Sequence, residues 1–576
     1  MNILGISGQD RDGAAALIRD GVVVAAIEEE KLARVRHVGM SYSGGLPFHA
    51  VEFCLHHGGI RFDQLDYVAY YMEPAKLLGR TIRFRAGRIF KSPGVSSLQA
   101  FPYYFIDSLN GFRQRLKTRH LSMERLGERG QFVAVNHQAA HAASAFYPSG
   151  FERAAIIVAG NSGDMSPTSL MTGEGFRIEP GRQAPFPHSL GMVYSAVTAA
   201  LGFGDSGEEH KTMWLAPSGE DEFHDLFQNL LLIGRAGLPS VNLNYFDGSF
   251  KGSPSLSRRF HDETGLKPRT AGEPLTKTHR NVAASLQARL DEVICEMASR
   301  LRVQSGEENL CLAGGVALNS LSNTAIEKRT GFKRLFIQPA AGNAGCSLGA
   351  ALYLWHNVLG NRERKYEMRD LFLGPAFKDE EIKTVLDNCK LRYEYFLTED
   401  KLNMEVATLL AKGNIVGWFR GPMEFGPRAL GSRSILASPA TEMMRENLNV
   451  YIKHREDFRP FSASVPEESA SDFFEPSGLT SFLQGICRVV EAKRSLIPTA
   501  VFGDGIARVH TVRRTDNPSF WKLLVKFGEM TGVPVLVNTS FNLFGEPVVS
   551  NPREAVRGFF CSGLDCLAIE NFLVKK

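Results

Sequence analysis

The chain has 576 residues, of which 44% are hydrophobic and 22% are charged, a composition that excludes a largely disordered or fibrous protein. Its length exceeds what a single hydrophobic core usually supports, so we expect at least two domains. The formal charge of +4, from 66 basic and 62 acidic residues, excludes a surface devoted as a whole to nucleic acid.

Glycine, cysteine and apolar runs narrow the class further. The 55 glycines favour tight turns and close approaches of the backbone to ligands. The 8 cysteines form no C-x2-C pair, which is typical of buried thiols in a reducing compartment. The sequence has neither an apolar run of about 18 residues nor the pattern of a signal peptide. We therefore expect a cytoplasmic enzyme without a transmembrane segment.

The N-terminus predicts a meander of three strands at residues 2–7, 14–18 and 22–27, because Asp20-Gly21 between two apolar runs is a hairpin signal. Apolar residues at steps of three and four predict a long helix over 282–301. Strands that alternate with helices indicate an α/β architecture. The further strands that we predict are at 67–71, 132–135, 154–159, 309–313 and 334–338.

Residues 73–130 differ from their surroundings, with 12 Lys or Arg, 4 Asp or Glu and a net charge of +8. They also contain aromatic residues from Phe84 to Phe112. One interpretation is a basic, aromatic surface for a membrane or an acidic partner. The other is an inserted helical hairpin that packs its apolar side on the domain and exposes its basic side. The segment is also a candidate homodimer interface.

A domain boundary is predicted where the highly charged run 361–369 precedes Gly374-Pro375. A second α/β pattern follows, with a helix at 380–386 and a strand at 415–419. We therefore predict one domain over 1–362, with the basic insertion, and another over 370–576.

Two histidines follow the strand predicted at 132–135. His137 and His141 lie four residues apart in an alanine-rich stretch that predicts a helix. They would share one helix face, where two imidazoles can bind one metal with at least one further ligand. The same spacing also suits two core or capping histidines.

Three glycine turns each follow a predicted strand. They contain Ser162-Gly163, Gly314-Gly315 with Asn319, and Gly342-Asn343. Backbone N–H groups in such turns can cradle phosphate. None of the turns has the Walker or Rossmann fingerprint, so nucleotide binding and ordinary strand-ending turns both remain open.

The second half places arginines beside glycines and hydroxyls, an arrangement that suits a bidentate grip on phosphate. The alternative is a solvated basic face. Apolar and turn-forming neighbours of Arg428 and Arg459 favour a buried pocket instead. The residues concerned are Arg428, Lys453, Arg459, Arg508, Asn538 and Ser540.

Long motifs stand in a fixed order along the chain. They are ILGIS, the Glu28-Glu29-Glu30 run that leads to Arg34 and His37, the two histidines, LAGGVALN, PAAGNAG, GPRALGSRS, FRPF, DGIARVHTV and NTSFNLFGEP. With these motifs the chain resembles, over essentially its full length, the nodulation-protein/cephem carbamoyltransferase family, which includes the tobramycin carbamoyltransferase.

The resemblance implies an N-terminal actin/hexokinase-like, duplicated α/β domain. The C-terminal α/β domain would resemble the domain that forms threonylcarbamoyl adenylate. It would make carbamoyladenylate from carbamoyl phosphate and ATP with Mg²⁺. The first domain would pass the carbamoyl group to a hydroxyl or amine of a small molecule, as in antibiotic and other secondary metabolism. No nucleic-acid partner is implied.

The resemblance also implies site residues. His137 and His141 would bind a divalent metal of the iron type. The implied catalytic residues are Arg11, Asp12, Arg428, Lys453 and Arg459. The residues implied to bind the nucleotide or its phosphates are Ser162, Gly163, Gly314, Gly315, Asn319, Asn343, Arg508, Asn538 and Ser540.

Departures from the family pattern concentrate in the first domain. The family usually has an aspartate just after the strand that ends here in Val158-Ala159-Gly160, and no aspartate stands there. Asn343 replaces another, so divalent-ion affinity should fall. Arg11 replaces a histidine that is a candidate base, and the bulky His210 and Trp214 replace glycines. The leading hypothesis is a carbamoyltransferase. The alternatives are another ATP-dependent adenylation or condensation on the same scaffold, and a binding protein without transfer activity.

Overall fold

The computed structural model describes residues 1–91, 95–163, 166–204, 207–234, 237–247, 255–270 and 272–576; the side chains of residues 83–105 and 107 lie outside the description. The predicted meander is confirmed, and two parallel strands extend it into a sheet of order β3-β2-β1-β4-β5. Its elements are β1 (Asn2–Ser7), β2 (Ala14–Arg19), β3 (Val22–Glu28), α1 (Glu29–Ala33), α2 (Phe48–Gly58), β4 (Tyr67–Tyr70) and β5 (Gln131–Ala134).

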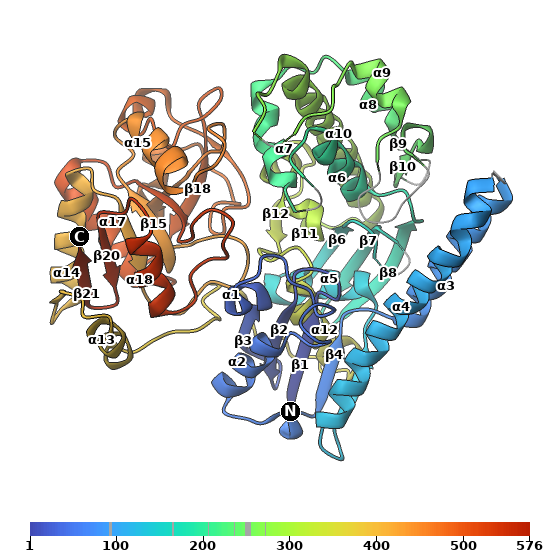
Figure 1. The fold of residues 1–576 in the computed structure, drawn as a ribbon, viewed down its shortest axis with the longest axis horizontal. Helices are drawn as coiled ribbons and strands as arrows, with labels where there is room; N and C mark the ends of the chain where they lie inside the picture. The colour runs from blue at the N-terminus through green and yellow to red at the C-terminus, as the bar shows by residue number, and fades with distance from the viewer. Residues whose placement is uncertain (92–94, 164–165, 205–206, 235–236, 248–254, 271) are drawn as a thin grey trace.

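A second sheet repeats this topology (Figure 1). Three antiparallel strands, β6, β7 and β8, correspond to β1, β2 and β3, and the parallel strands β11 and β12 correspond to β4 and β5. The predicted duplication of the actin/hexokinase-like domain is therefore present in the strand order itself. The strands are β6 (Arg153–Ala159), β7 (Thr168–Glu174), β8 (Arg177–Ala184), β11 (Asn309–Ala313) and β12 (Arg334–Ile337).

Two helices meet between the sheets. α5 (His137–Phe146) packs on β6 and β11, α12 (Gly345–Tyr353) packs on β1 and β2, and the two helices pack on each other. This contact lies at the centre of the domain. The long helix α10 (Lys277–Ser305) belongs to the half of the domain that contains the second sheet. The other elements of this half are α6 (Leu190–Ala200), α7 (Glu209–Leu215), α8 (His224–Leu230), β9 (Leu231–Ile233), β10 (Pro239–Val241), α9 (Arg258–Thr264) and α11 (Ser320–Arg329).

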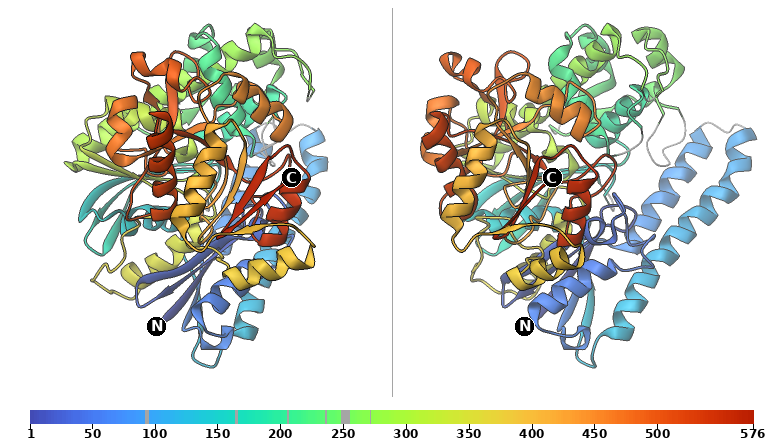
Figure 2. Two further views of the ribbon diagram at one scale, coloured as in Figure 1. Left: turned by 90° about the vertical axis from the view of Figure 1, so that its left-hand side faces the viewer. Right: turned by 60° about the vertical axis from the view of Figure 1, so that its left-hand side comes forward.

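The basic insertion is a helical hairpin, as one of the two interpretations predicted. It consists of α3 (Pro74–Lys91) and α4 (Val95–Arg125), and it projects from the body of the protein (Figure 2). Its aromatic side chains from Phe84 to Phe105 lie outside the described residues. The base of the hairpin packs on the first domain, where Thr118 of α4 donates to the Gly45 carbonyl at 2.7 Å.

The C-terminal part contains a nine-stranded mixed sheet of order β13-β21-β20-β14-β15-β19-β16-β18-β17. Separate apolar clusters form with α14 and α17 and with α13 and α18. The elements are α13 (Asp379–Asn388), β13 (Glu394–Tyr395), α14 (Glu399–Ala411), β14 (Val416–Phe419), β15 (Arg433–Ala437), α15 (Met443–Glu446), β16 (Ser462–Pro466), α16 (Ala470–Phe473), β17 (Cys487–Arg488), β18 (Ile506–Val512), α17 (Pro518–Thr531), β19 (Leu536–Ser540), α18 (Pro552–Phe560), β20 (Cys566–Ile569) and β21 (Phe572–Lys575).

The predicted elements lie close to those observed. The strands predicted at 2–7 and 309–313 have the observed bounds, and the others differ from theirs by one residue at one or both ends. The helix predicted at 282–301 lies within α10. The prediction of uniformly buried thiols is wrong for Cys389 and Cys561, which are exposed. Among the described residues, no helix has the length and apolarity to cross a bilayer. The division at 362 and 370 separates the strands through β12 from those beginning with β13, and we propose it as the domain boundary.

Candidate functional site

The two predicted histidines lie buried on α5, at the centre of the first domain. Asn136 caps this helix by accepting hydrogen bonds from the Gln138 and Ala139 amides at 3.1 and 3.2 Å, which fixes where the histidine face begins. The rings of His137 and His141 are 4.6 Å apart between centroids and nearly perpendicular. The spacing of four residues therefore brings both imidazoles together, as predicted.

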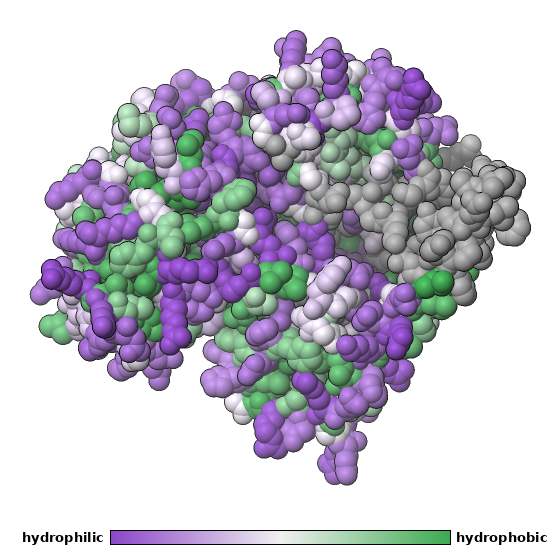
Figure 3. Space-filling view, in the orientation of Figure 1, coloured by the Kyte–Doolittle hydropathy of each residue, from purple (hydrophilic) through white to green (hydrophobic). Residues whose placement is uncertain are grey.

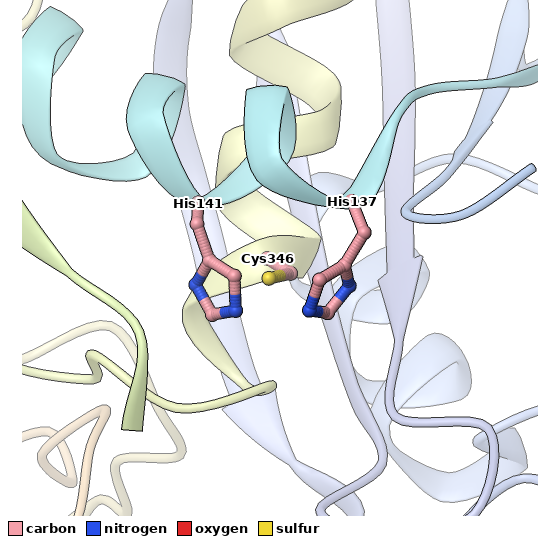
Figure 4. Close-up of side chains that lie close together, drawn as sticks. All are labelled: His137, His141 and Cys346. Carbon is pink, nitrogen blue, oxygen red and sulfur yellow. The ribbon is translucent and has the colours of Figure 1, made fainter. Parts of the chain in front are cut away.

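The sulfur of Cys346 completes a group of three candidate ligand atoms. One ring nitrogen of each histidine and the Cys346 sulfur lie within 4.8 Å of one another (Figure 4). A close helix crossing makes this possible, since a Cβ at Gly349 of α12 would lie 1.8 Å from the Ala140 carbonyl oxygen of α5. Sequence reasoning missed Cys346, although its place just after the PAAGNAG turn puts it in the first turn of a helix.

A second group surrounds the predicted Arg11 and Asp12. The His37 ring lies 2.7 Å from Asp12 through Nδ1, and its backbone amide donates to Glu30 at 2.7 Å. Burial raises the pKa of Asp12, but the hydrogen bond and charge of His37 outweigh this and the pKa lies below its usual value. Asp12 therefore remains a carboxylate that can orient His37.

The surroundings of this histidine are crowded and cationic. The Arg36 guanidinium lies 3.5 Å from His37 Nε2. A Cβ at Gly207 would lie 2.2 Å from the Arg11 guanidinium and 3.1 Å from His37 Nε2. Gly207 has a φ of +110°, which favours glycine at this position. Its backbone therefore lies close beside Arg11 and His37. Sequence reasoning had His37 in a motif but gave it no role.

The predicted glycine turns differ in what they contact. A Cβ at Gly315 would meet nothing within 4 Å, whereas one at Gly314, where φ is +92°, would lie 2.2 Å from the Ala159 carbonyl oxygen. Asn319 caps α11 by accepting from Leu321 and Ser322. The Asn343 side-chain amide donates to the Arg11 carbonyl at 3.3 Å. The turn at Gly315 thus faces open space, while Asn319 is engaged in the fold.

The Ser162-Gly163 turn is bound by the inserted hairpin. Arg80 of α3 donates to the Ser162 and Gly163 carbonyls at 2.8 and 2.6 Å. Arg115 of α4 donates to the Asp10 carboxylate at 2.9 Å. Helices α3 and α4 therefore contact two loops of the first domain, the Ser162-Gly163 turn and the loop that contains Asp10. The sequence did not predict these contacts.

The predicted arginines of the second domain converge. Burial is the main cause of the lowered pKa of Arg428 and of Arg508. The charge of Arg459 lowers the pKa of Arg428 further, and the charges of Arg428, Arg455 and Arg459 lower that of Arg508. The pKa of Arg428 falls to about 10. Within the described part of the chain, no ion pair joins Arg428 or Arg508 to a carboxylate; Arg508 donates to the Leu483 carbonyl at 2.9 Å. Buried positive charge without a carboxylate favours a bound anion.

Lys453, Asn538 and Ser540 lie beside this cluster. The Lys453 ammonium donates to the Ser540 and Asn542 carbonyls at 2.7 and 3.0 Å and to Asn542 Oδ1 at 2.7 Å. Asn538 donates to Ser464 at 3.0 Å, while its own amide oxygen is buried and has no hydrogen-bond partner among the described residues. Lys453 therefore fixes the Ser540–Asn542 turn next to the arginines.

The first domain packs directly against this arginine cluster. Arg428 donates to the Leu318 carbonyl at 3.4 Å, and Trp214 of α7 lies under the Arg508 guanidinium, 5.7 Å from ring centroid to carbon. Lys211 of α7 pairs with Glu456 at 2.8 Å. The bulky residue at position 214 thus contacts the partner domain, and Figure 3 shows hydrophilic residues gathered along the seam between the domains.

Residues at the start of helix α1 form a second contact between the two domains. Glu28 accepts from the Gly426 amide at 2.7 Å, and Lys31 donates to the Glu424 and Gly426 carbonyls at 2.7 and 2.8 Å. Glu28 and Lys31 also pair with each other at 2.8 Å, with only 7% and 3% of their side chains exposed. The EEEKLAR run therefore contacts the loop that carries Arg428.

Family profiles match both parts of the chain. Residues 2–352 match "Carbamoyltransferase N-terminus", and residues 407–576 match "Carbamoyltransferase C-terminus". Together with the duplicated domain and the arginine-lined second domain, these matches define a two-domain group-transfer enzyme. The chain belongs to the carbamoyltransferase family and is a carbamoyltransferase.

Relatives agree over most of the length. The chain is 37% identical over 610 residues to an uncharacterised Synechocystis protein, covering 100% of this chain and 97% of the relative. It is 34% identical to the nodulation protein NolNO of Sinorhizobium fredii, covering 98% and 79%. Among solved structures, HypF of T. kodakarensis matches with a TM-score of 0.33 and 14% identity over 63% of this chain and 48% of its own.

Proposed function

We propose that this carbamoyltransferase uses ATP and carbamoyl phosphate. Its second domain makes carbamoyladenylate, and its first domain transfers the carbamoyl group to a hydroxyl or amine of a small-molecule acceptor, as in secondary metabolism. The observation that carries the proposal is the cluster of Arg428, Arg459 and Arg508, of which Arg508 is buried and the other two are partly buried. Within the described part of the chain, Arg428 and Arg508 have no carboxylate partner. Triphosphate and carbamoyl phosphate are anions that supply such partners.

The chemistry balances in three steps. Water releases phosphate from carbamoyl phosphate and leaves carbamate, whose oxygen attacks the α-phosphorus of ATP and displaces pyrophosphate. The acceptor oxygen or nitrogen then attacks the carbamoyl carbon, AMP leaves, and the acceptor proton passes to a base. Mg²⁺ bound to the triphosphate would neutralise charge in the second step.

The described residues suggest a role for each group. Arg428, Arg459 and Arg508 would bind the phosphates, and Lys453 would fix the turn that carries Ser540. The amide oxygen of Asn538 is available to a ligand donor. In the first domain, Asp12 would orient His37, whose Nε2 would accept the acceptor proton in place of the histidine that Arg11 replaces. Arg11 lies beside this base, and its charge would stabilise the leaving AMP.

The contact between the domains suits a reactive intermediate. His210 of α7 lies near Arg428, Arg459 and Arg36, and burial together with these charges lowers the pKa of His210 well below its usual value. Arg36 also lies 3.5 Å from His37. His210 and Arg36 therefore connect the arginine cluster with His37 across the seam between the domains. Transfer along this seam would shield carbamoyladenylate from water.

Labelled ATP tests the proposal against other ATP chemistry. Full-length protein with α-³²P ATP and carbamoyl phosphate should yield AMP and a labelled adenylate, with unlabelled pyrophosphate. Formation of ADP in place of AMP would mean phosphoryl transfer and would overturn the adenylation step. Omission of carbamoyl phosphate is the control, and it should abolish both products.

A further inference from the structure

The group of His137, His141 and Cys346 forms a compact set of donors at the point where α5 meets α12. The three residues are buried, with 8%, 2% and 0% of their surface exposed. Figure 4 shows both rings directed toward the space beside the sulfur. The sequence analysis had supplied only the two histidines of this set.

Geometry brings one ligand atom from each of the three residues to a single space. The ring centroids of His137 and His141 are 4.6 Å apart, and one nitrogen of each ring and the Cys346 sulfur all lie within 4.8 Å of one another. Imidazole nitrogens are common metal ligands, so both rings can bind one cation in this space.

The donor types do not fit the hard, carboxylate-rich site that the family resemblance implies. No aspartate stands directly after β6, where Gly160 and Asn161 lie, and Asp164 lies outside the described residues. The Asn343 amide donates to the Arg11 carbonyl. In the described part of the chain, no carboxylate joins the group of the two histidines and the cysteine. Two imidazoles and a thiolate are softer donors, which zinc-class ions prefer over Mg²⁺.

We propose that His137, His141 and Cys346 bind one zinc-class divalent cation, with the Cys346 thiolate as the anionic ligand. Binding forms two metal–nitrogen bonds and one metal–sulfur bond, and the thiol proton leaves to solvent. Usual bond lengths of about 2.0 and 2.3 Å place neighbouring ligand atoms roughly 3.5 Å apart, so small side-chain rotations close the group. Three protein ligands leave a fourth position open, as in catalytic rather than structural zinc sites.

Cobalt is a suitable probe because a thiolate ligand gives Co²⁺ an intense charge-transfer absorption. Metal-free full-length protein titrated with Co²⁺ should show this band at one equivalent, and Zn²⁺ should abolish it. Cys346→Ser should lose the band, and His141→Ala should weaken Co²⁺ binding at least tenfold. The matched control is Cys311→Ser, a buried cysteine of β11 outside the group, which should keep the band.

A band that survives in Cys346→Ser, or absence of any stoichiometric band in the folded wild type, would overturn the proposal. X-ray absorption of the zinc-loaded wild type provides a measurement that needs no variant. It should find one sulfur at about 2.3 Å, and a shell of nitrogen and oxygen alone would contradict the proposal. Neither measurement involves ATP or an acceptor, so their outcome is independent of the proposed function.

Discussion

At the scale of single residues, the pairing of His37 with Asp12 makes His37 the candidate base of the proposed transfer site, in place of the histidine that Arg11 replaces. The Nδ1 contact of 2.7 Å orients the ring, and the lowered pKa of Asp12 keeps the carboxylate ionised. His37→Asn should therefore reduce carbamoyl transfer about 10²- to 10⁴-fold. Pyrophosphate release should be unchanged. Transfer is measured with ¹⁴C-carbamoyl phosphate and acceptors screened from hydroxyl- and amine-bearing small molecules.

A matched histidine separates this role from a general effect of substitution. His49 also contacts a carboxylate, Glu29, at 2.7 Å, but its side chain is 59% exposed and lies outside the group. His49→Asn should leave transfer within twofold of wild type. Equal transfer by His37→Asn and wild type would exclude His37 as the base.

At the scale of elements, α1 is a buried connection between the domains. Lys31→Met would leave the Glu28 carboxylate buried and unpaired, and we expect a loss of about 3–5 kcal/mol in unfolding free energy. Adding Glu28→Gln removes the charge while an acceptor remains for the Gly426 amide. The double variant should therefore be more stable than Lys31→Met alone, as measured by thermal unfolding.

The exposed pair of Arg61 and Asp63 provides the control for that comparison. Arg61 is 75% exposed at 2.9 Å from Asp63, so Arg61→Met should leave the free energy of unfolding close to that of the wild type. A double variant less stable than Lys31→Met would contradict the buried-charge explanation.

The contact between the α3–α4 hairpin and the Ser162-Gly163 turn leads to a second prediction at this scale. Arg80→Met removes the donor to the Ser162 and Gly163 carbonyls, which should loosen this turn of the proposed transfer domain. We expect the KM for the acceptor to rise at least threefold while adenylation is unchanged. Arg119→Met, an exposed substitution on α4, is the control. A rise in the KM for ATP instead would contradict this prediction, because it would mean that the hairpin acts on the domain proposed to form the adenylate.

At the scale of the whole molecule, much of the fold was predictable because it follows from local sequence patterns, namely apolar runs and the spacing of residues. The apolar runs gave the strands nearly to the residue, and the spacing of His137 and His141 placed both on one helix face. Cys346 was not predictable, because its approach to His141 depends on the packing of two helices distant in sequence. Arg80 and Lys31 were missed for the same reason, since long-range docking creates their partners.

The most direct test of the account separates the two half-reactions on the intact chain. Purified protein with ATP and carbamoyl phosphate, without acceptor, is assayed for pyrophosphate. We expect the wild type to release pyrophosphate and Arg428→Ala to lose this activity. His137→Ala and the exposed control Arg514→Ala should retain it. No release by folded wild-type protein, or equal loss in Arg428→Ala and His137→Ala, would contradict the assignment of adenylation and transfer to separate domains.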